Sequence, residues 1–346
     1  MTDAYVPTGV HVLPDLRAPA IAAPSLSGTL IQIAYIVLPV FGLMALGLGA
    51  AWARYLPESV GEALGDFVFM VALPLLLFRT LATAEVPDQS PWPLWISYFG
   101  GLAVAWIIAD QMIRRVFGRD FKAGVIAGVS AGFSNAVLFG VPLVFTAFGD
   151  EGAVPLLLVV AVQLPVMMTV GTILIEQAER RDGSRTGPLS LRSIAGSVAY
   201  NLIRNPLIIG VVAGLAWRFA ALPYEGIPAV IVDRLSAAAL PCALFALGMS
   251  LRKYGIRGHV LPGALIAGLK LMVMPAIVWL LAAHVFGLPP LWTTVVTVVS
   301  ACPTGVNAWL IANRFRTGHA IAANTISISA AASLLTMSFW LAVLGV

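Results

Sequence analysis

Apolar runs long enough to cross a lipid bilayer repeat along most of this sequence. A helix needs about 20 apolar residues to span the hydrocarbon core. Only 10% of the 346 residues are charged and 60% are hydrophobic, whereas a soluble domain has about 25% charged residues. Ten runs of spanning length can be placed, at 30–52, 62–83, 94–113, 122–148, 151–175, 201–220, 229–251, 260–286, 290–313 and 319–344. The sequence therefore predicts an all-α, multi-pass protein whose surroundings are the lipid bilayer.

Basic residues indicate which loops between these runs face the cytoplasm. Most of the 20 Lys and Arg residues lie in alternate loops, with clusters at 114–122, 180–192 and 252–257. Because short loops rich in Lys and Arg stay on the cytoplasmic side, these loops are predicted to be cytoplasmic and both termini external. The same distribution accounts for the net charge of +4, so we expect no nucleic-acid partner. Residues 1–27 fit neither a signal peptide nor a helix and are predicted to be a peripheral tail.

Two of the runs are interrupted in their middle by polar and helix-breaking residues. The first interruption, within 128–149, contains Gly132, Phe133, Ser134, Asn135, Gly140 and Pro142. The second, within 299–312, contains Pro303, Thr304, Gly305 and Asn307. Backbone groups freed at bilayer depth must be satisfied by protein or by a water-filled cavity. Paired broken helices of this kind indicate the binding site of a transporter.

The two halves of the chain also repeat. LPLLLF at 73–78 corresponds to LPCALF at 240–245, Asp66 corresponds to Asp233, and VSA at 129–131 corresponds to VSA at 299–301. Each half contains five runs, and an odd number of spans reverses the orientation of the second half. The sequence therefore predicts two inverted five-helix repeats, related by an axis in the membrane plane, whose broken helices cross.

Crossed broken helices favour a negatively charged or dipolar substrate. Each break brings a positive amino end and a negative carboxyl end to the same small volume near the midplane. Asn135 and Asn307 add donors and acceptors without net charge, which suits a carboxylate. The alternative is that these amides, with Ser134 and Thr304, only restore backbone hydrogen bonds.

Four further polar residues lie inside runs and are candidates for function. Lys270 is far from a run end and is a candidate for neutralising an anion or for coupling, with snorkelling or structural pairing as the alternative. Asp110 is a weaker candidate for coupling, because it precedes Arg114 by four residues and an intrahelical pair explains it. Gln163 and Asn324 lie at depths suited to substrate contact, and helix–helix hydrogen bonding is the alternative for both. Asp66 and Asp233 are interpreted as structural charges at helix starts.

Enzymatic signatures find little support. GVSAG at 128–132 matches the nucleophile motif GxSxG with Ser130 as the nucleophile, but that motif needs a strand–turn–helix and a histidine base. Here apolar helix flanks the motif and no histidine lies in the centre of a run. Neither HExxH, a P-loop nor GxGxxG is present, and Cys242 and Cys302 form no metal-binding pattern. We therefore predict no catalytic residues, no metal site and no cofactor.

Three segments resemble the auxin efflux carrier family, which includes plant PIN proteins and bacterial organic-acid carriers. They are VALPLLLFRTLA at 71–82, GFSNAVLFGVPLVFTAFG at 132–149 and ACPTGVNAWLIANRF at 301–315. The resemblance implies a ten-helix fold like that of sodium/proton antiporters and bile-acid symporters. It places Asn135 at the family's crossover asparagine, Pro303 at its ninth-span proline and Gln163 near the substrate. Ser134 and Asn307 replace prolines of the plant pattern and the central loop is short, which favours a bacterial inner-membrane carrier.

The resemblance also implies how the chain divides. After the tail at 1–27, spans 1–2 (28–89) and 6–7 (193–258) are expected to form a scaffold and homodimer interface. Spans 3–5 (90–176) and 8–10 (259–346) are expected to form a mobile transport domain, and 177–192 is the central cytoplasmic loop.

We therefore predict a secondary transporter of small organic anions, mono- or dicarboxylates, that works by an elevator-type movement. An exporter of auxin-like aromatic acids is the alternative within transport, and an intramembrane serine hydrolase using Ser130 is the alternative from another class. A small polar pocket would favour malonate-like substrates, and a wide apolar one would favour aromatic acids.

Overall fold

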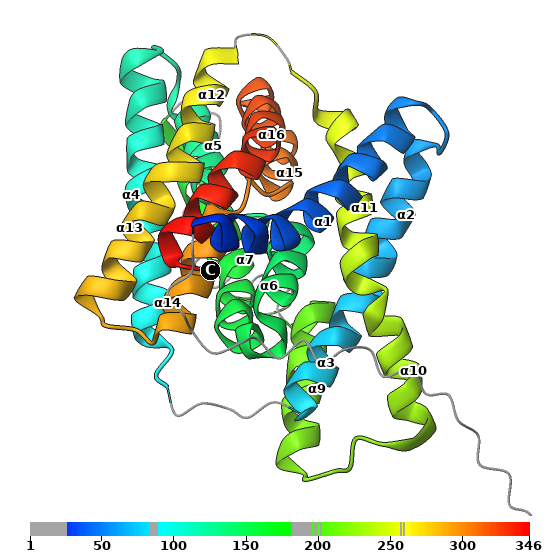
Figure 1. Cartoon of the computed structure of the whole chain (residues 1–346). Helices are drawn as coiled ribbons and strands as arrows, with labels where there is room; N and C mark the ends of the chain where they lie inside the picture. The colour runs from blue at the N-terminus through cyan, green and yellow to red at the C-terminus, as the bar shows by residue number, and fades with distance from the viewer. Residues whose placement is uncertain are drawn as a thin grey trace, which may run out of the picture.

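The computed structural model describes residues 26–83, 89–181, 196, 200, 203–256, 258 and 260–346. Every regular element in these residues is helical (Figure 1). Nearly all of the predicted tail and most of the predicted loop at 177–192 lie outside the described residues.

The described helices follow one another along the chain. They are α1 (Leu26–Trp52), α2 (Glu58–Phe67), η1 (Val68–Ala72), α3 (Leu73–Thr83), α4 (Trp92–Gln111), η2 (Met112–Val116), α5 (Phe121–Gly132), η3 (Ala136–Gly140), α6 (Val141–Phe148), η4 (Gly149–Gly152), α7 (Ala153–Arg181), α9 (Pro206–Phe219), α10 (Gly226–Ala237), α11 (Ala239–Tyr254), α12 (Val260–Gly268), η5 (Leu269–Val273), α13 (Met274–Leu280), η6 (Leu281–Val285), α14 (Pro290–Ala301), α15 (Asn307–Arg314) and α16 (His319–Leu344).

Seven helical stretches of the described chain are long and apolar enough to cross a membrane. They lie at Leu30–Trp52, Glu58–Thr83, Trp92–Val116, Ala136–Arg180, Gly226–Tyr254, Val260–Val285 and His319–Leu344. Three shorter apolar helices, α5, α9 and α14, lie within the remaining predicted runs. The prediction of an all-α, multi-pass membrane protein is confirmed, and each of the ten predicted runs contains helix.

Proline explains the widened turns inside several of these helices. Pro74, Pro142 and Pro275 each occupy the second position of an α-helix that follows a five-residue π-helical segment. A proline lacks the N–H that would bond four residues back, and its ring clashes with that carbonyl. The helix widens instead, so that the N–H of the residue before each proline bonds five residues back. Lys270 lies in one of these segments, η5.

Glycines bring the helices into close contact. α1 packs against α11 and α3 packs against α9, as Figure 1 shows at its right and lower right. A Cβ atom at Gly47 of α1 would lie 2.1 Å from the Phe245 carbonyl oxygen of α11. A Cβ at Gly214 of α9 would lie 2.7 Å from the Phe78 carbonyl oxygen of α3. Only glycine permits backbones to approach this closely, as is common between membrane helices.

Candidate functional site

The two interrupted helices meet at their interruptions. α5 ends at Gly132 and α14 ends at Ala301, and a single antiparallel bridge then joins Ser134 to Thr304. The Asn135 N–H donates to the Pro303 carbonyl at 2.8 Å, and the Gly305 N–H donates to the Phe133 carbonyl at 2.8 Å. Each interruption therefore satisfies backbone groups that the other one frees, as a buried backbone requires.

Gly305 permits this approach because it has no side chain. A Cβ atom there would lie 2.7 Å from Cδ1 of Phe133 and 3.2 Å from the Ser134 carbonyl oxygen. Gly140 also lies close to the other interruption, since a Cβ would be 3.3 Å from Sγ of Cys302. Gly132 packs against Leu102 of α4, and Pro142 is buried in α6.

Polar side chains donate to carbonyl groups in the last turns of α5 and α14, the two helices that stop at the interruptions. The Thr304 hydroxyl donates to the Ser130 carbonyl of α5 at 2.8 Å, and the Thr304 N–H donates to Oγ of Ser329 at 3.0 Å. Nζ of Lys270 donates to the Ser300 carbonyl in the last turn of α14. A cation at the carboxyl end of a helix is favourable because that end carries partial negative charge.

Lys270 also belongs to a buried hydrogen-bonded cluster centred on Ser134. Its Nζ lies 2.9 Å from Oγ of Ser134, and the Tyr98 hydroxyl lies 3.0 Å from the same oxygen. The Tyr98 hydroxyl also lies 3.0 Å from Oε1 of Gln163, and Nε2 of Gln163 donates to the Ser134 carbonyl at 2.8 Å. All four side chains are buried. The cluster links α4, α7 and η5 to the first interruption, and Lys270 does not snorkel towards a membrane surface.

Tyr98 was missed by the sequence reasoning. It lies in WPLWISYFGG at 92–101, where a phenol among apolar and aromatic residues gives no periodic signal. A hydroxyl inside a spanning run needs a hydrogen-bond partner, and that requirement is the one signal that could have identified Tyr98.

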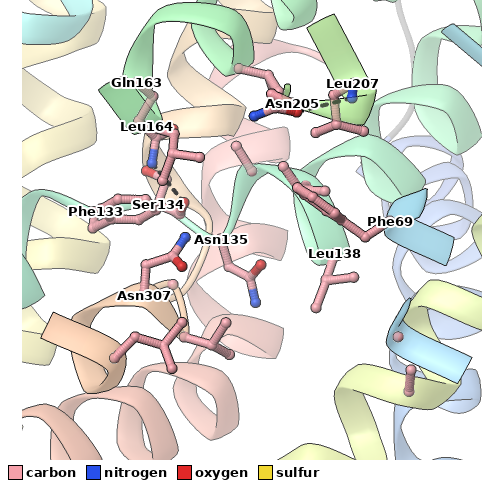
Figure 2. Close-up of a pocket in the computed structure, with 18 of the residues that line it drawn as sticks. Phe69, Phe133, Ser134, Asn135, Leu138, Gln163, Leu164, Asn205, Leu207 and Asn307 are labelled. Atoms are coloured by element: carbon pink, nitrogen blue, oxygen red, sulfur yellow. Dashed lines mark hydrogen bonds between the residues drawn. The ribbon is translucent and has the colours of Figure 1, made fainter. Parts of the chain in front are cut away.

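A cavity of about 550 Å³ borders the interruptions. Phe133, Ser134, Asn135, Gly305 and Asn307 line it, together with Gln163 of α7. Figure 2 shows Asn135 and Asn307 on the same side of this space. Asn135 is only 6% exposed, and neither its amide nor that of Asn307 has a hydrogen-bond partner among the described residues. Two amides that line one cavity and have no such partner are available to a ligand.

The opposite wall of the cavity comes from α2, η1, α3, α9 and α11. It is largely apolar, with Phe69, Leu77, Leu207 and Ala246, and carries a few polar groups. Asn205 is one of them: its Oδ1 accepts from the Leu207 N–H at 2.9 Å and caps α9, and its amide N–H groups have no partner in the part of the chain that the structure describes (Figure 2). Sequence reasoning missed Asn205, although Asn before Pro is a helix-start signal.

Five of the residues predicted for substrate contact or coupling do not line the cavity: Pro303, Thr304 and Lys270 lie at the junction of the interruptions, and Asn324 and Asp110 lie away from it. Asn324 is fully buried in α16, beside Gly263 of α12. Asp110 lies near the end of α4, where Oδ2 accepts from Arg114 at 3.2 Å and from Gln111 at 2.9 Å. The intrahelical partner expected for Asp110 is therefore present.

Ser130 does not have the surroundings of a nucleophile. It is fully buried inside α5, and its hydroxyl donates to the Ile126 carbonyl at 2.8 Å. This bond within one helix repeats the ordinary behaviour of serine in membrane helices.

Comparison with known proteins identifies relatives along nearly the whole chain. A family model described as "Membrane transport protein" matches residues 33–341. The chain is 25% identical over 320 residues to a Rhizobium meliloti protein named "Putative malonate transporter", covering 89% of this chain and 94% of that one. It is 26% identical over 316 residues to an "Uncharacterized transporter" of Methanothermobacter thermautotrophicus, covering 89% and 97%. It is 25% identical over 251 residues to the "Lysosomal cholesterol signaling protein" of Mus musculus, covering 69% and 28%.

Proposed function

The chain belongs to the membrane transport protein family, as its resemblance to auxin efflux carriers predicted, and from this premise we propose that it is a secondary transporter of small organic anions. Members of this family are transporters rather than enzymes. The observation that carries the proposal is the pair of amides of Asn135 and Asn307, which have no partner among the described residues and line one cavity where the interrupted helices meet.

The helix ends around this cavity support an anionic substrate. The first turns of η3 and α15 supply Ala136, Val137, Leu138 and Asn307 to the lining. N–H groups in a first turn have no partner within their own helix and carry partial positive charge. The opposing carbonyl ends are already occupied by Thr304 and Lys270. The helix ends that face the cavity are therefore amino ends, which favour an anion as at other anion sites on helix starts, whereas the carboxylates of the lining, Glu62 and Asp66, lie on α2.

Mono- and dicarboxylates are the substrates that we favour. The Rhizobium meliloti relative carries malonate in its name, and amides with helix N–H groups are suitable donors to carboxylate oxygens. Aromatic acids are the second candidate, because the wall formed by Phe69, Leu77 and Leu138 is apolar. Apolar lining with a few polar groups is typical of sites that bind larger organic ligands.

Matched contacts support the arrangement of the chain as two inverted repeats with crossing broken helices. The bond from Asn135 to Pro303 has a counterpart in the bond from Gly305 to Phe133. The approach of Gly47 to Phe245 has a counterpart in the approach of Gly214 to Phe78. In each case the second contact joins the two residues that correspond, in the opposite halves, to the two residues of the first contact. A two-fold axis in the membrane plane requires this correspondence.

Alternating access by an elevator movement is supported by the position of the cavity. On one side the lining reaches Glu62, whose side chain is 66% exposed, and Asp66. In the predicted topology this side is cytoplasmic. Towards the other side, Arg79 of α3 pairs with Asp150 of η4 at 3.2 Å. In the proposed mechanism the structure is an inward-open state, and α4–α7 and α12–α16 move against α1–α3 and α9–α11 (Figure 1). The proposal includes a homodimer through the latter group.

Transport by purified protein in proteoliposomes tests the proposal. We expect uptake of labelled malonate down its gradient, and loss of at least about tenfold of that uptake in Asn135→Ala, because one or more carboxylate hydrogen bonds of about 1.5–3 kcal/mol each is removed. Asn313→Ala is the matched control, since Asn313 is exposed on α15 and does not line the cavity.

Competition by a panel of unlabelled mono-, di- and aromatic carboxylates assigns the substrate class. Inhibition by aromatic acids at lower concentration than by malonate would favour the second candidate. Wild-type protein that transports no member of the panel would overturn the proposed function. An Asn135→Ala variant as active as Asn313→Ala would overturn the assigned site.

A further inference from the structure

Lys270 is a basic side chain with no exposed surface, placed between the two interrupted helices. Its side chain reaches Ser300 at the end of α14 and Ser134 in the first interruption. An ammonium group removed from water is costly unless a negative partner compensates it. None of the partners of Lys270 is a carboxylate: they are a carbonyl, a hydroxyl and a thioether.

The hydrogen-bond geometry around Nζ suits an amine that gains and loses one proton. A neutral amine has two N–H groups, and the two oxygen partners of Lys270 accept both. The third N–H of an ammonium group has only Sδ of Met274, at 3.6 Å, which is a weak acceptor. In the neutral form both N–H groups are therefore bonded, whereas the charged form lacks one good partner and a counter-charge.

The surrounding helices supply no fixed carboxylate. η5 packs against α4, α5, α12, α13, α14 and α16. From these elements and the segment after α14, Tyr98 and Cys302 are the titratable side chains that face Lys270. The other titratable residues of these six helices, within the described chain, lie near helix ends: Asp110, Lys122 and His319. A negative charge that compensates the Lys270 ammonium group must therefore come from outside these six helices and the segment after α14.

Ser134 connects Lys270 to the cavity. It accepts from Nζ and also belongs to the cavity lining, next to Asn135. We propose that Lys270 is neutral while the cavity is empty and takes up one proton when a carboxylate binds, so that each anion is carried with one proton. For the transfer the Ser134 hydroxyl turns to donate its hydrogen to the Nζ lone pair and takes a proton from cavity water in its place, and the bound carboxylate supplies the counter-charge. This inference rests on the proposed transport of organic anions.

Calorimetric titration of the purified, full-length protein with malonate measures the proton directly. Repeating the titration in two buffers of different ionisation enthalpy gives the number of protons taken up per anion. We expect about one proton near pH 8, where malonate itself is fully ionised. Because the complex then holds one proton more than the free protein, malonate affinity falls about tenfold per pH unit above the titration range of the amine.

Lys270→Arg separates coupling from binding. A guanidinium stays charged at every accessible pH, so this variant is expected to bind malonate with no proton uptake and with an affinity that does not change between pH 7.5 and 8.5. Lys122→Arg, the same change at the half-buried start of α5, is expected to keep the wild-type proton uptake. If Lys270→Arg is not monodisperse, Lys270→Met serves instead, with weaker binding and no proton uptake expected.

The outcomes separate this inference from the transport proposal. Wild-type protein that binds malonate without proton uptake overturns the role of Lys270 and leaves anion transport intact. Proton uptake that persists in Lys270→Arg or Lys270→Met assigns the proton to another group. Failure of the wild-type protein to bind any carboxylate contradicts the proposed function itself.

Discussion

Replacing Thr304 by valine removes one hydroxyl from the junction of the two interrupted helices. Valine has nearly the same shape, so the packing around residue 304 is preserved and the Thr304 N–H can still donate to Ser329. What is lost is the 2.8 Å hydrogen bond to the Ser130 carbonyl, in the last turn of α5. Thr304 is 1% exposed, so water cannot replace the hydroxyl.

The expected cost follows from the burial of that carbonyl. Leaving a buried acceptor without a partner costs about 1–3 kcal/mol, and interhelical hydrogen bonds in membranes average about 0.6 kcal/mol with a maximum near 1.7. We therefore expect Thr304→Val to lower the free energy of unfolding by about 1–2 kcal/mol, which changes the ratio of folded to unfolded protein by roughly 5- to 30-fold.

Reversible unfolding in mixed micelles of mild detergent and dodecyl sulfate measures this difference. Thr336→Val in α16 is the matched control, because the Thr336 hydroxyl donates only to Ala332 of its own helix at 3.3 Å. A Thr304→Val variant as stable as Thr336→Val would refute the reasoning that this hydroxyl holds the interrupted helices together.

Three further predictions address the junction, the buried cluster and the outer closure. Gly305→Ala should lower the melting temperature, because overpacking against Phe133 costs about 1–3 kcal/mol. Gly268→Ala is the control and should leave the melting temperature unchanged, because nothing lies within 4 Å of a Cβ atom there. Equal melting temperatures of the two variants would contradict the close approach of Gly305 to Phe133. Tyr98→Phe should weaken malonate binding several-fold by releasing Ser134 and Gln163, as calorimetry can measure, whereas Tyr55→Phe on the surface should leave it unchanged. Asp150→Asn should cost less than about 1 kcal/mol of stability, since its pair with Arg79 is largely exposed. It should nevertheless speed modification of Leu138→Cys by an external, membrane-impermeant thiol reagent, and an unchanged rate would argue against Arg79–Asp150 as the outer closure.

The sequence was most informative where polar residues break an apolar run. Ser134 and Thr304 stand out because a membrane interior tolerates free backbone groups only in special surroundings. From this the two interruptions were predicted correctly. Their direct pairing through Asn135, Pro303, Gly305 and Phe133 depends on how the two segments meet in three dimensions, which no local pattern encodes.

The depth of a residue along its helix did not predict whether its side chain lines the cavity, because that depends on the side of the helix on which the residue lies. Gln163 and Asn324 were placed at similar depths, but Gln163 lines the cavity and Asn324 faces α12. A shift of one residue turns a side chain by about 100° around the helix. Where a run is apolar on all sides, its pattern therefore does not show which side chains face the cavity. Tyr98 and Asn205 were missed for related reasons, since one lies among apolar aromatic residues and the other doubles as a helix cap.

Diffraction from crystals grown with a bromine-labelled dicarboxylate, such as bromomalonate, tests the central claim most directly. The claim is that an organic anion binds where the two interrupted helices leave Asn135 and Asn307 without protein partners. The account predicts an anomalous bromine peak inside the cavity, within contact distance of these two amides and of the first turns of η3 and α15. A peak elsewhere in the protein, with the cavity between Asn135 and Asn307 occupied by water alone, would contradict it.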